Sequence, residues 1–225
     1  MDSCTNDDQF GDLLRFLQLN DFRVVIIEGP RGSGKTTCCT RLLERSDLLY
    51  YKTWGSEQKW IRAQMQSSFK LDLPQGCYFA LDFIKQALPA ISRPILMDRG
   101  NISALAYQRE FTWGSNKDLR VYYVDLMKSC SACLLVMSTP VSSILERRVA
   151  RGDGDEQRLH ALPVHQAESI VSRDVRVYEE SVDDMCTAGL DEVALFDVGG
   201  ATTCTCYVPK DTELIVEAMN YVEGE

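Results

Sequence analysis

The segment Arg23-Val-Val-Ile-Ile-Glu-Gly-Pro-Arg-Gly-Ser-Gly-Lys-Thr36 joins a short apolar run to a glycine-rich turn. Its four consecutive apolar residues, at positions 24–27, are typical of a strand buried on both faces, as in a parallel sheet. The turn has the spacing Gly-x-x-x-x-Gly-Lys-Thr, and the residues from Thr36 to Arg45 are predicted to be helical. A turn of this spacing between a strand and a helix predicts a phosphate-binding loop, or P-loop.

The chemistry of the loop residues explains this prediction. Glycines let the backbone fold so that its N–H groups point at phosphate oxygens, and the helix N-terminus adds partial positive charge. Lys35 would bring a full charge to the β- and γ-phosphates, and the Thr36 hydroxyl would bind Mg²⁺. We therefore predict that a nucleoside triphosphate contacts the following residues: Gly29, Arg31, Gly32, Ser33, Gly34, Lys35, Thr36 and Thr37.

Strand and helix patterns alternate along the rest of the chain. Strands are predicted at residues 23–28, 48–51, 94–97, 132–137 and 192–197, and helices at 57–69, 76–88, 103–110, 117–128, 141–151, 166–185 and 211–222. This alternation predicts a three-layer αβα P-loop kinase fold with a five-stranded parallel sheet. We expect one domain over residues 1–225, with an N-terminal extension at 1–20 that docks through a short amphipathic helix, and a lid loop at 152–163.

Composition limits the class of protein. The net charge of −9 argues against a non-specific nucleic-acid binder, and the longest apolar runs fall short of the roughly 20 residues that span a bilayer. The nine cysteines are odd in number, so we expect reduced thiols in a cytoplasmic protein, in the host cytoplasm if the protein is viral. Cys130 and Cys133 have zinc or redox spacing without a second such pair, and Cys204 and Cys206 alternate as in a strand.

Two absences narrow the kind of P-loop protein. The sequence has no Asn-Lys-x-Asp motif to read guanine, which argues against a switch GTPase. Asp98, at the end of a predicted strand, is followed by Arg99, whereas ATPase motors usually have glutamate after this aspartate.

Two further segments resemble the thymidylate kinase and deoxynucleoside kinase group of P-loop kinases. Asp98-Arg-Gly-Asn-Ile-Ser-Ala-Leu-Ala-Tyr-Gln108 is similar to the thymidylate kinase run that begins Asp-Arg-Tyr and ends Ser-x-Leu-Ala-Tyr-Gln. Leu145-Glu-Arg-Arg-Val-Ala-Arg-Gly152, with Asp155 beyond it, resembles the helix that leads into the lid of that family. Thr139-Pro140 lies where the family ends its fourth strand. The resemblance runs from Val24 to about Tyr221 and is strongest at the P-loop and these two segments.

The resemblance implies a set of catalytic residues: Lys35, Asp98, Arg99, Arg147 and Arg151. Asp98 would bind Mg²⁺ through water or accept a proton from an acceptor hydroxyl, and Arg99 would bind the acceptor's phosphate or the γ-phosphate. Arg147 and Arg151 would stabilise charge on the transferred phosphoryl group. The alternatives are a salt bridge at the strand end for Asp98 and Arg99, and a solvated basic helix face for Arg147 and Arg151. Tyr107 and Gln108 would line the acceptor pocket by stacking and by pairing with a pyrimidine edge.

Three positions depart from the thymidylate kinase pattern. Arg31 replaces the usual acidic residue of the P-loop, Phe83 stands where the family has a phosphate-binding arginine, and Lys52-Thr-Trp54 replaces an Arg-Glu-Pro type of turn. Lys52 and Trp54 are therefore candidate acceptor contacts. Because a buried monophosphate needs paired cationic donors, these changes weaken the case for free dTMP as acceptor.

The expected activity is an ATP- and Mg²⁺-dependent kinase of a pyrimidine deoxynucleotide. One alternative is a hydroxyl acceptor, either a deoxynucleoside or 5-hydroxymethyluracil in bacteriophage DNA, although the negative charge disfavours DNA. Another is an ATP-binding regulatory protein with little turnover. Related kinases are often homodimers, so a homodimer is one expectation for the assembly.

Overall fold

The computed structural model describes residues 5–53, 81, 84–100, 102–103, 106, 117–151 and 159–215, with side chains described from Phe10 and, after the second long gap, from Arg120. Several predictions fall outside these ranges. They are the helix at 57–69, most of the helices at 76–88 and 103–110, the larger part of the lid loop, and the residues Trp54, Tyr107 and Gln108.

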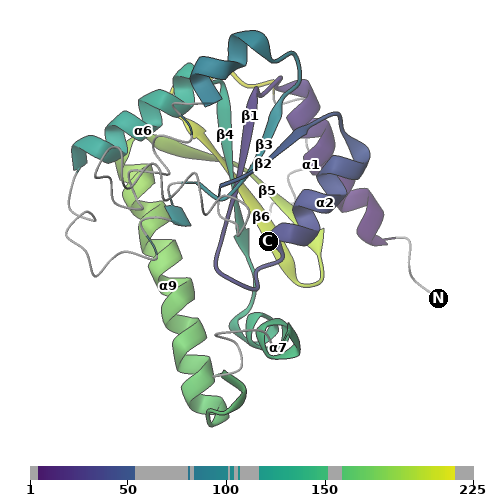
Figure 1. Ribbon diagram of the computed structural model, residues 1–225, viewed down its shortest axis with the longest axis vertical. Helices are drawn as coiled ribbons and strands as arrows, with labels where there is room; N and C mark the ends of the chain where they lie inside the picture. Colours follow the sequence, from purple (N-terminus) through teal and green to yellow (C-terminus); the bar gives the residue numbers. More distant parts are fainter. Residues whose placement is uncertain are drawn as a thin grey trace, which may run out of the picture.

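A mostly parallel sheet of six strands forms the centre of the molecule (Figure 1). Its order is β2–β3–β1–β4–β6–β5, and the strands are β1 (Val24–Glu28), β2 (Leu49–Lys52), β3 (Ile95–Asp98), β4 (Ala132–Ser138), β5 (Leu190–Gly199) and β6 (Thr202–Pro209). The first four pair in parallel, with Ile27 of β1 opposite both Asp98 and Leu135. All five residues of β1 are buried, which explains its unbroken apolar run.

The sheet corrects the predicted count of five parallel strands. Residues 202–209 form the additional strand β6, which lies between β4 and β5 and is antiparallel to both. β5 and β6 make a hairpin in which Gly199 pairs with Thr202, and the two loop residues Gly200 and Ala201 have φ of 65° and 56°. Two positive φ angles in a two-residue loop define a type I′ turn, whose twist matches that of paired strands.

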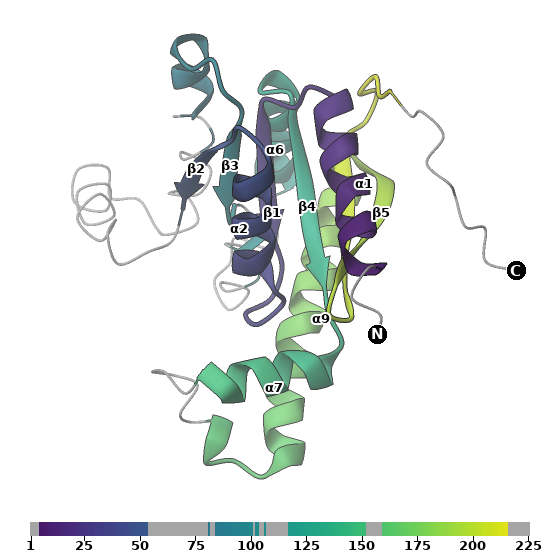
Figure 2. The same ribbon diagram turned by 90° about the vertical axis from the view of Figure 1, so that its right-hand side faces the viewer.

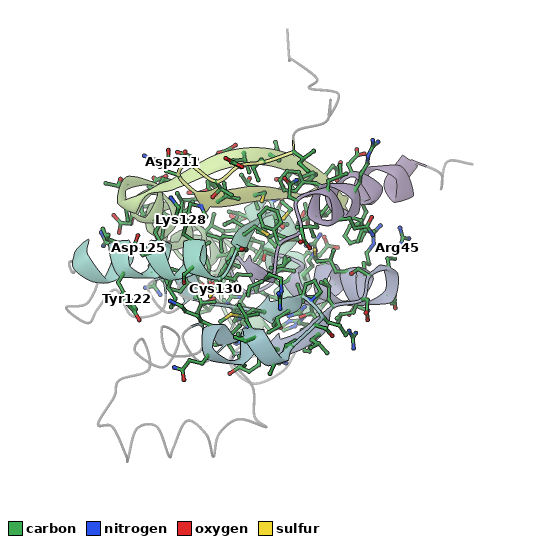
Figure 3. All side chains as sticks on the ribbon, turned by 90° about the horizontal axis from the view of Figure 1, so that it is seen from above. Arg45, Tyr122, Asp125, Lys128, Cys130 and Asp211 are labelled. Carbon is green, nitrogen blue, oxygen red and sulfur yellow. The ribbon has the colours of Figure 1, made fainter. Side chains whose placement is uncertain are left out.

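Helices cover both faces of the sheet (Figure 1). α6 (Lys117–Ser129) and α9 (Val164–Ala188) pack on one face, where Tyr123, Met127, Tyr178 and Met185 join the sheet in one core cluster. In the view of Figure 3, Tyr122, Asp125 and Lys128 lie on the outer part of α6, whereas Cys130, just after the helix, lies among packed side chains. The predicted helices at 117–128 and 166–185 are thus confirmed, with α9 a few residues longer.

The opposite face carries α1 (Thr5–Leu19) and α2 (Lys35–Arg45). Phe10, Leu13 and Phe16 of α1 are buried against β5 and α2, so residues predicted as a docked extension complete the second core cluster. Phe16 also contacts Phe196 of β5 with ring centroids 5.4 Å apart. The helical periodicity of the sequence predicted α1, and the structure shows that α1 covers β5 of the sheet.

α7 (Val141–Arg151) and the first turns of α9 project beyond the carboxyl end of β4 (Figure 2). The bounds of α7 match the predicted helix. A short 3₁₀ helix, η2 (Leu88–Ala90), precedes β3. Residues 211–215 are not helical, which contradicts the start of the helix expected at 211–222. In the described ranges, we find no helix with the length and apolarity needed to cross a bilayer.

Candidate nucleotide-binding site

The P-loop follows β1 directly, and its backbone requires its glycines. Gly29, Gly32 and Gly34 have φ of 142°, 90° and 92°, in the region that side-chain-bearing residues avoid. A Cβ atom at Gly29 would lie 2.8 Å from the Met137 carbonyl oxygen, so the loop also passes too close to β4 for any larger residue. The P-loop therefore leads into α2 with its N-terminal N–H groups available to an anion.

Lys35 lies at the start of α2 and is 6% exposed. Its Nζ donates to the carbonyl oxygens of Gly29 and Pro30, at 2.6 and 2.7 Å, and to Ser33 Oγ at 3.4 Å. Burial and the neighbouring Arg99 charge lower the pKa of Lys35 well below its usual value, while Glu28 and Asp98 oppose the shift. The ammonium group is thus held by the loop that would bind phosphate, and a phosphate would add its negative charge to those of Glu28 and Asp98.

Asp98 ends β3, beside the P-loop strand, as the sequence predicted for this edge of the sheet. It is 5% exposed and accepts a hydrogen bond of 2.8 Å from Tyr50 Oη. Burial is the main cause of the pKa shifts of Lys35 and Cys39 in α2, and the Asp98 charge raises the pKa of both groups. Asp98 therefore lies near the N-terminus of the P-loop helix, where a carboxylate can serve a bound cation or an acceptor proton.

Arg99 adopts a left-handed backbone conformation, with φ of 72°, which is rare outside glycine and asparagine. Its Nη1 donates to Ser103 Oγ at 2.8 Å and to Tyr178 Oη at 2.9 Å. Arg99 therefore donates to the hydroxyl groups of Ser103 and of Tyr178 in α9.

Glu28 is a site residue that the sequence interpretation missed. It ends β1, is fully buried, and accepts hydrogen bonds from the backbone N–H groups of Gly100 (2.6 Å) and Ser103 (2.9 Å) through Oε1. Its Oε2 accepts the Ser103 hydroxyl. With that proton donated to Glu28, Tyr178 must donate its own to Ser103 Oγ, at 2.7 Å.

The contacts form a directed chain in which Arg99 donates to Tyr178, Tyr178 to Ser103 and Ser103 to Glu28. The available signal was a glutamate that ends a fully apolar strand, since a buried carboxylate needs partners. Its partners are 72 and 75 residues away along the chain, so the sequence did not show which they are.

Arg147 brings α7 to the P-loop. Its Nη1 lies 3.4 Å from the Gly32 carbonyl oxygen, and its Nη2 donates to the Gly200 carbonyl oxygen at 2.7 Å. Both nitrogens lie 3.2 Å from Thr202 Oγ1. Arg147 thus lies between the P-loop and the β5–β6 turn, and its role at a nucleotide stays a prediction.

The other arginines of α7 behave differently. Arg151, which was predicted to act with Arg147, is exposed at the end of the helix and has no hydrogen-bond or ion-pair partner among the described residues. Arg148 is 7% exposed and forms a 2.8 Å ion pair with Asp174 of α9. This pair fastens α7 to α9, since breaking one partner of a buried ion pair leaves an uncompensated charge.

The remaining candidate residues lie around the same edge of the sheet. Thr36 and Thr37 are exposed in the first turn of α2, Arg31 is half-buried in the P-loop, and Lys52 is exposed at the end of β2. The described chain holds no group of three or more metal-ligating side chains. A magnesium site in a P-loop protein needs none, because one or two protein oxygens act with phosphates and water. Thr36 and Asp98 fit that donor set.

A cavity of about 200 Å³ opens beside the P-loop, between α9 and the sheet. Pro30 and Thr139 line it at the P-loop end, and Tyr178, Val182 and Tyr207 line it farther along α9 and β6. The cavity therefore adjoins the loop that would bind phosphate.

Comparisons with known proteins show the fold. No protein-family model matches this sequence, and no curated protein matches it. Among solved structures, the chain is similar to the YorR protein from Bacillus subtilis, crystallised in complex with phosphorylated GDP, at 18% sequence identity and a TM-score of 0.50. The match covers 72% of this chain and 80% of that protein. At this identity, the likeness establishes a shared mixed α/β architecture.

Proposed function

We propose that this protein is an ATP-dependent phosphotransferase that acts on a pyrimidine deoxynucleotide. The observation that carries the proposal is the convergence of Lys35, Asp98 and Arg147 at the P-loop, from three different segments of the chain. A protein that only binds nucleotide needs the loop and the lysine. An additional carboxylate and an arginine beside the loop favour group transfer, because they act on charge that develops during the reaction.

The proposed reaction is an in-line displacement on the γ-phosphorus of ATP. The acceptor oxygen forms a bond to phosphorus, and the bond between that phosphorus and the β–γ bridging oxygen breaks to release ADP. Lys35 would exchange its carbonyl partners for phosphate oxygens, and Arg147 would neutralise the leaving charge. Thr36 and Asp98 would hold Mg²⁺, which would supply positive charge to the phosphates when bound.

The solved relative gives supporting chemistry. The YorR structure contains a phosphorylated guanosine nucleotide. A nucleotide in a protein of similar fold is consistent with nucleotide binding here, and it leaves the base and the acceptor to experiment.

A hydroxyl acceptor is the second candidate. Phe83 stands where thymidylate kinases have an arginine for the acceptor phosphate, which favours an uncharged acceptor such as a deoxynucleoside or a hydroxymethylated base in DNA. Asp98 would then accept the hydroxyl proton, and its hydrogen bond from Tyr50 would hold the carboxylate in place.

A transfer assay with γ-labelled ATP separates these candidates. The acceptors are dTMP, dUMP, dCMP, thymidine, 5-hydroxymethyl-dUMP and DNA containing 5-hydroxymethyluracil. We expect label on a pyrimidine deoxynucleotide; label on a nucleoside or on DNA alone would replace the first candidate by the second. Label on none, together with tight ATP binding, would identify a nucleotide-binding regulator.

Two variants test the site itself. Asp98→Asn should lower turnover at least ~100-fold, the scale of a positioned acid–base or metal group. Asp125→Asn, on the outer side of α6, is the matched control and should keep full turnover. Equal rates for the two variants would remove Asp98 from the mechanism.

A further inference from the structure

The β5–β6 turn is connected to the P-loop by two buried threonines. Thr139, just beyond the end of β4, and Thr202, the first residue of β6, are 6% and 3% exposed. Thr139 Oγ1 donates to the Ser33 carbonyl oxygen at 3.1 Å. The two threonine hydroxyl oxygens are 3.0 Å apart.

Counting protons fixes the direction of these hydrogen bonds. Each threonine hydroxyl has one proton, and Thr139 gives its proton to the Ser33 carbonyl oxygen. Thr202 Oγ1 has two possible acceptors, Thr139 Oγ1 at 3.0 Å and the Gly200 carbonyl oxygen at 3.4 Å, and the shorter contact assigns its proton to Thr139. Thr202 Oγ1 is then an acceptor for the two N–H groups of Arg147. The chain runs from Arg147 through Thr202 and Thr139 to the P-loop backbone.

The guanidinium group lies close to two glycines. A Cβ atom built at Gly34 would lie 3.4 Å from Arg147 Nη1, and one at Gly200 would lie 3.3 Å from Nη2. Arg147 is therefore packed between a P-loop glycine and a glycine of the hairpin turn. The Gly200 carbonyl oxygen, at 2.7 Å, fixes the outer end of the group.

We infer that Thr202 and Thr139 are positioning residues that align Arg147 with the P-loop for nucleotide binding and transfer. The inference deepens the proposed function, on which it rests, by naming the residues that orient one of its arginines. The Thr202 hydroxyl accepts hydrogen bonds from the guanidinium group and donates one to the Thr139 hydroxyl. A hydroxyl in this position is polarised, which strengthens each hydrogen bond of the chain. Movement of the Ser33 carbonyl on nucleotide binding would thus be transmitted to Arg147.

A double-mutant cycle tests the coupling. The variants are Thr202→Val, Arg147→Ala and their combination, with Thr203→Val as the control on the same strand. Thr202→Val keeps the shape and removes the acceptor, and we expect a fall in kcat of about 10- to 100-fold, the range of one hydrogen bond to a charged group. Thr202→Ser should restore most of the rate, and the ATP KM should change less than kcat.

The diagnostic result concerns Arg147→Ala. In that background, Thr202→Val should lower kcat by less than about 2-fold, because the group that it positions has gone. If the two single effects multiply in the double variant, or if Thr203→Val is as damaging as Thr202→Val, the inference is wrong.

The same four proteins are also compared in ATP affinity and in free energy of unfolding in urea. These two measurements separate a failure of the inference from a failure of the proposed function. A protein that binds ATP and transfers to no acceptor would refute the proposed reaction, and non-additive ATP affinities would still support the coupling. If the protein does not bind ATP, the proposed function fails. In that case, non-additive free energies of unfolding would show that Thr202 and Arg147 stabilise the fold together, and the positioning role would be overturned.

Discussion

Replacing Glu28 should destabilise the protein far more than replacing an exposed glutamate. In Glu28→Ala, the backbone N–H groups of Gly100 and Ser103 lose their acceptor in a region where Glu28 itself is 0% exposed. Each orphaned buried donor costs about 1–3 kcal/mol, so we expect a loss of about 4 kcal/mol. For a chain of this size, that is a fall in Tm of about 8–16 °C.

The amide variant Glu28→Gln sharpens the prediction. Its retained oxygen can still accept both backbone N–H groups, and its NH₂ group can donate to Ser103 Oγ if the serine hydroxyl turns to Tyr178. Only the charge is lost, and we expect a cost of about 2 kcal/mol, the difference between charged and neutral acceptors over this set of bonds.

Equilibrium unfolding in urea, followed by circular dichroism, measures all three proteins. The control is Glu168→Ala, on an exposed turn of α9, which should stay within about 0.5 kcal/mol of the wild type. If Glu28→Ala is no more destabilising than Glu168→Ala, or if Gln and Ala at this position are equivalent, then the hydrogen bonds to Gly100 and Ser103 do not hold this loop.

Three further outcomes are expected. Because burial lowers the pKa of Lys35, the unfolded chain keeps the Lys35 proton at alkaline pH values at which the folded chain has lost it. The free energy of unfolding of the wild type should therefore rise relative to that of Lys35→Met as the pH increases toward about 10.4. Parallel pH profiles of the two proteins in urea unfolding would contradict this. Burial raises the pKa of Cys38 to about 12, so at pH 8–9 a thiol reagent should label Cys186, the half-buried thiol, faster than Cys38, with each labelled site identified by peptide mass spectrometry; equal labelling of Cys38 and Cys186 would show that the core thiols are accessible. Ala201 has a φ of 56°, so Ala201→Gly should raise stability by about 0.5–1 kcal/mol, and a lower Tm would show that the turn is not strained there.

Much of the fold follows from local sequence patterns. The run of apolar residues at 24–27, the glycine spacing after it and the helical periodicity of residues 141–151 specify their elements without reference to the rest of the chain. For this reason β1, the P-loop and α7 agree with prediction almost to the residue. Lys35, Asp98 and Arg147 meet at one edge because parallel strands end there together.

The errors have a common physical cause in non-local contacts. Threonine and cysteine alternate only over residues 203–206, and a strand with so short a pattern is specified mainly by the partners β4 and β5. The alternation of Cys204 and Cys206 was visible, but the antiparallel place of the strand inside the sheet was not. The adjacent Gly199 and Gly200, between two such runs, were the local signal for a hairpin turn.

The contacts of three residues around the site also depend on non-local partners. Glu28, Thr139 and Thr202 acquire their roles from partners far away in sequence, whereas Arg151 shares a helix face with Arg147 and lacks such partners in the described chain. Helical spacing could identify the face of α7 that carries Arg147 and Arg151. Which of these arginines contacts the P-loop depends on the position of the β5–β6 turn.

The interior position of β6 has a consequence for biosynthesis. A chain that emerges from the ribosome N-terminus first makes β1, β2, β3 and β4 before the strand that must pair with β4 has been translated. During that interval β4 has a bare edge, which is a template for pairing with other chains. Nascent chains halted before residue 202 would lack both this edge protection and the threonine that contacts Arg147. The protein therefore gains its full sheet and the contact between Thr202 and Arg147 in the same late step of synthesis.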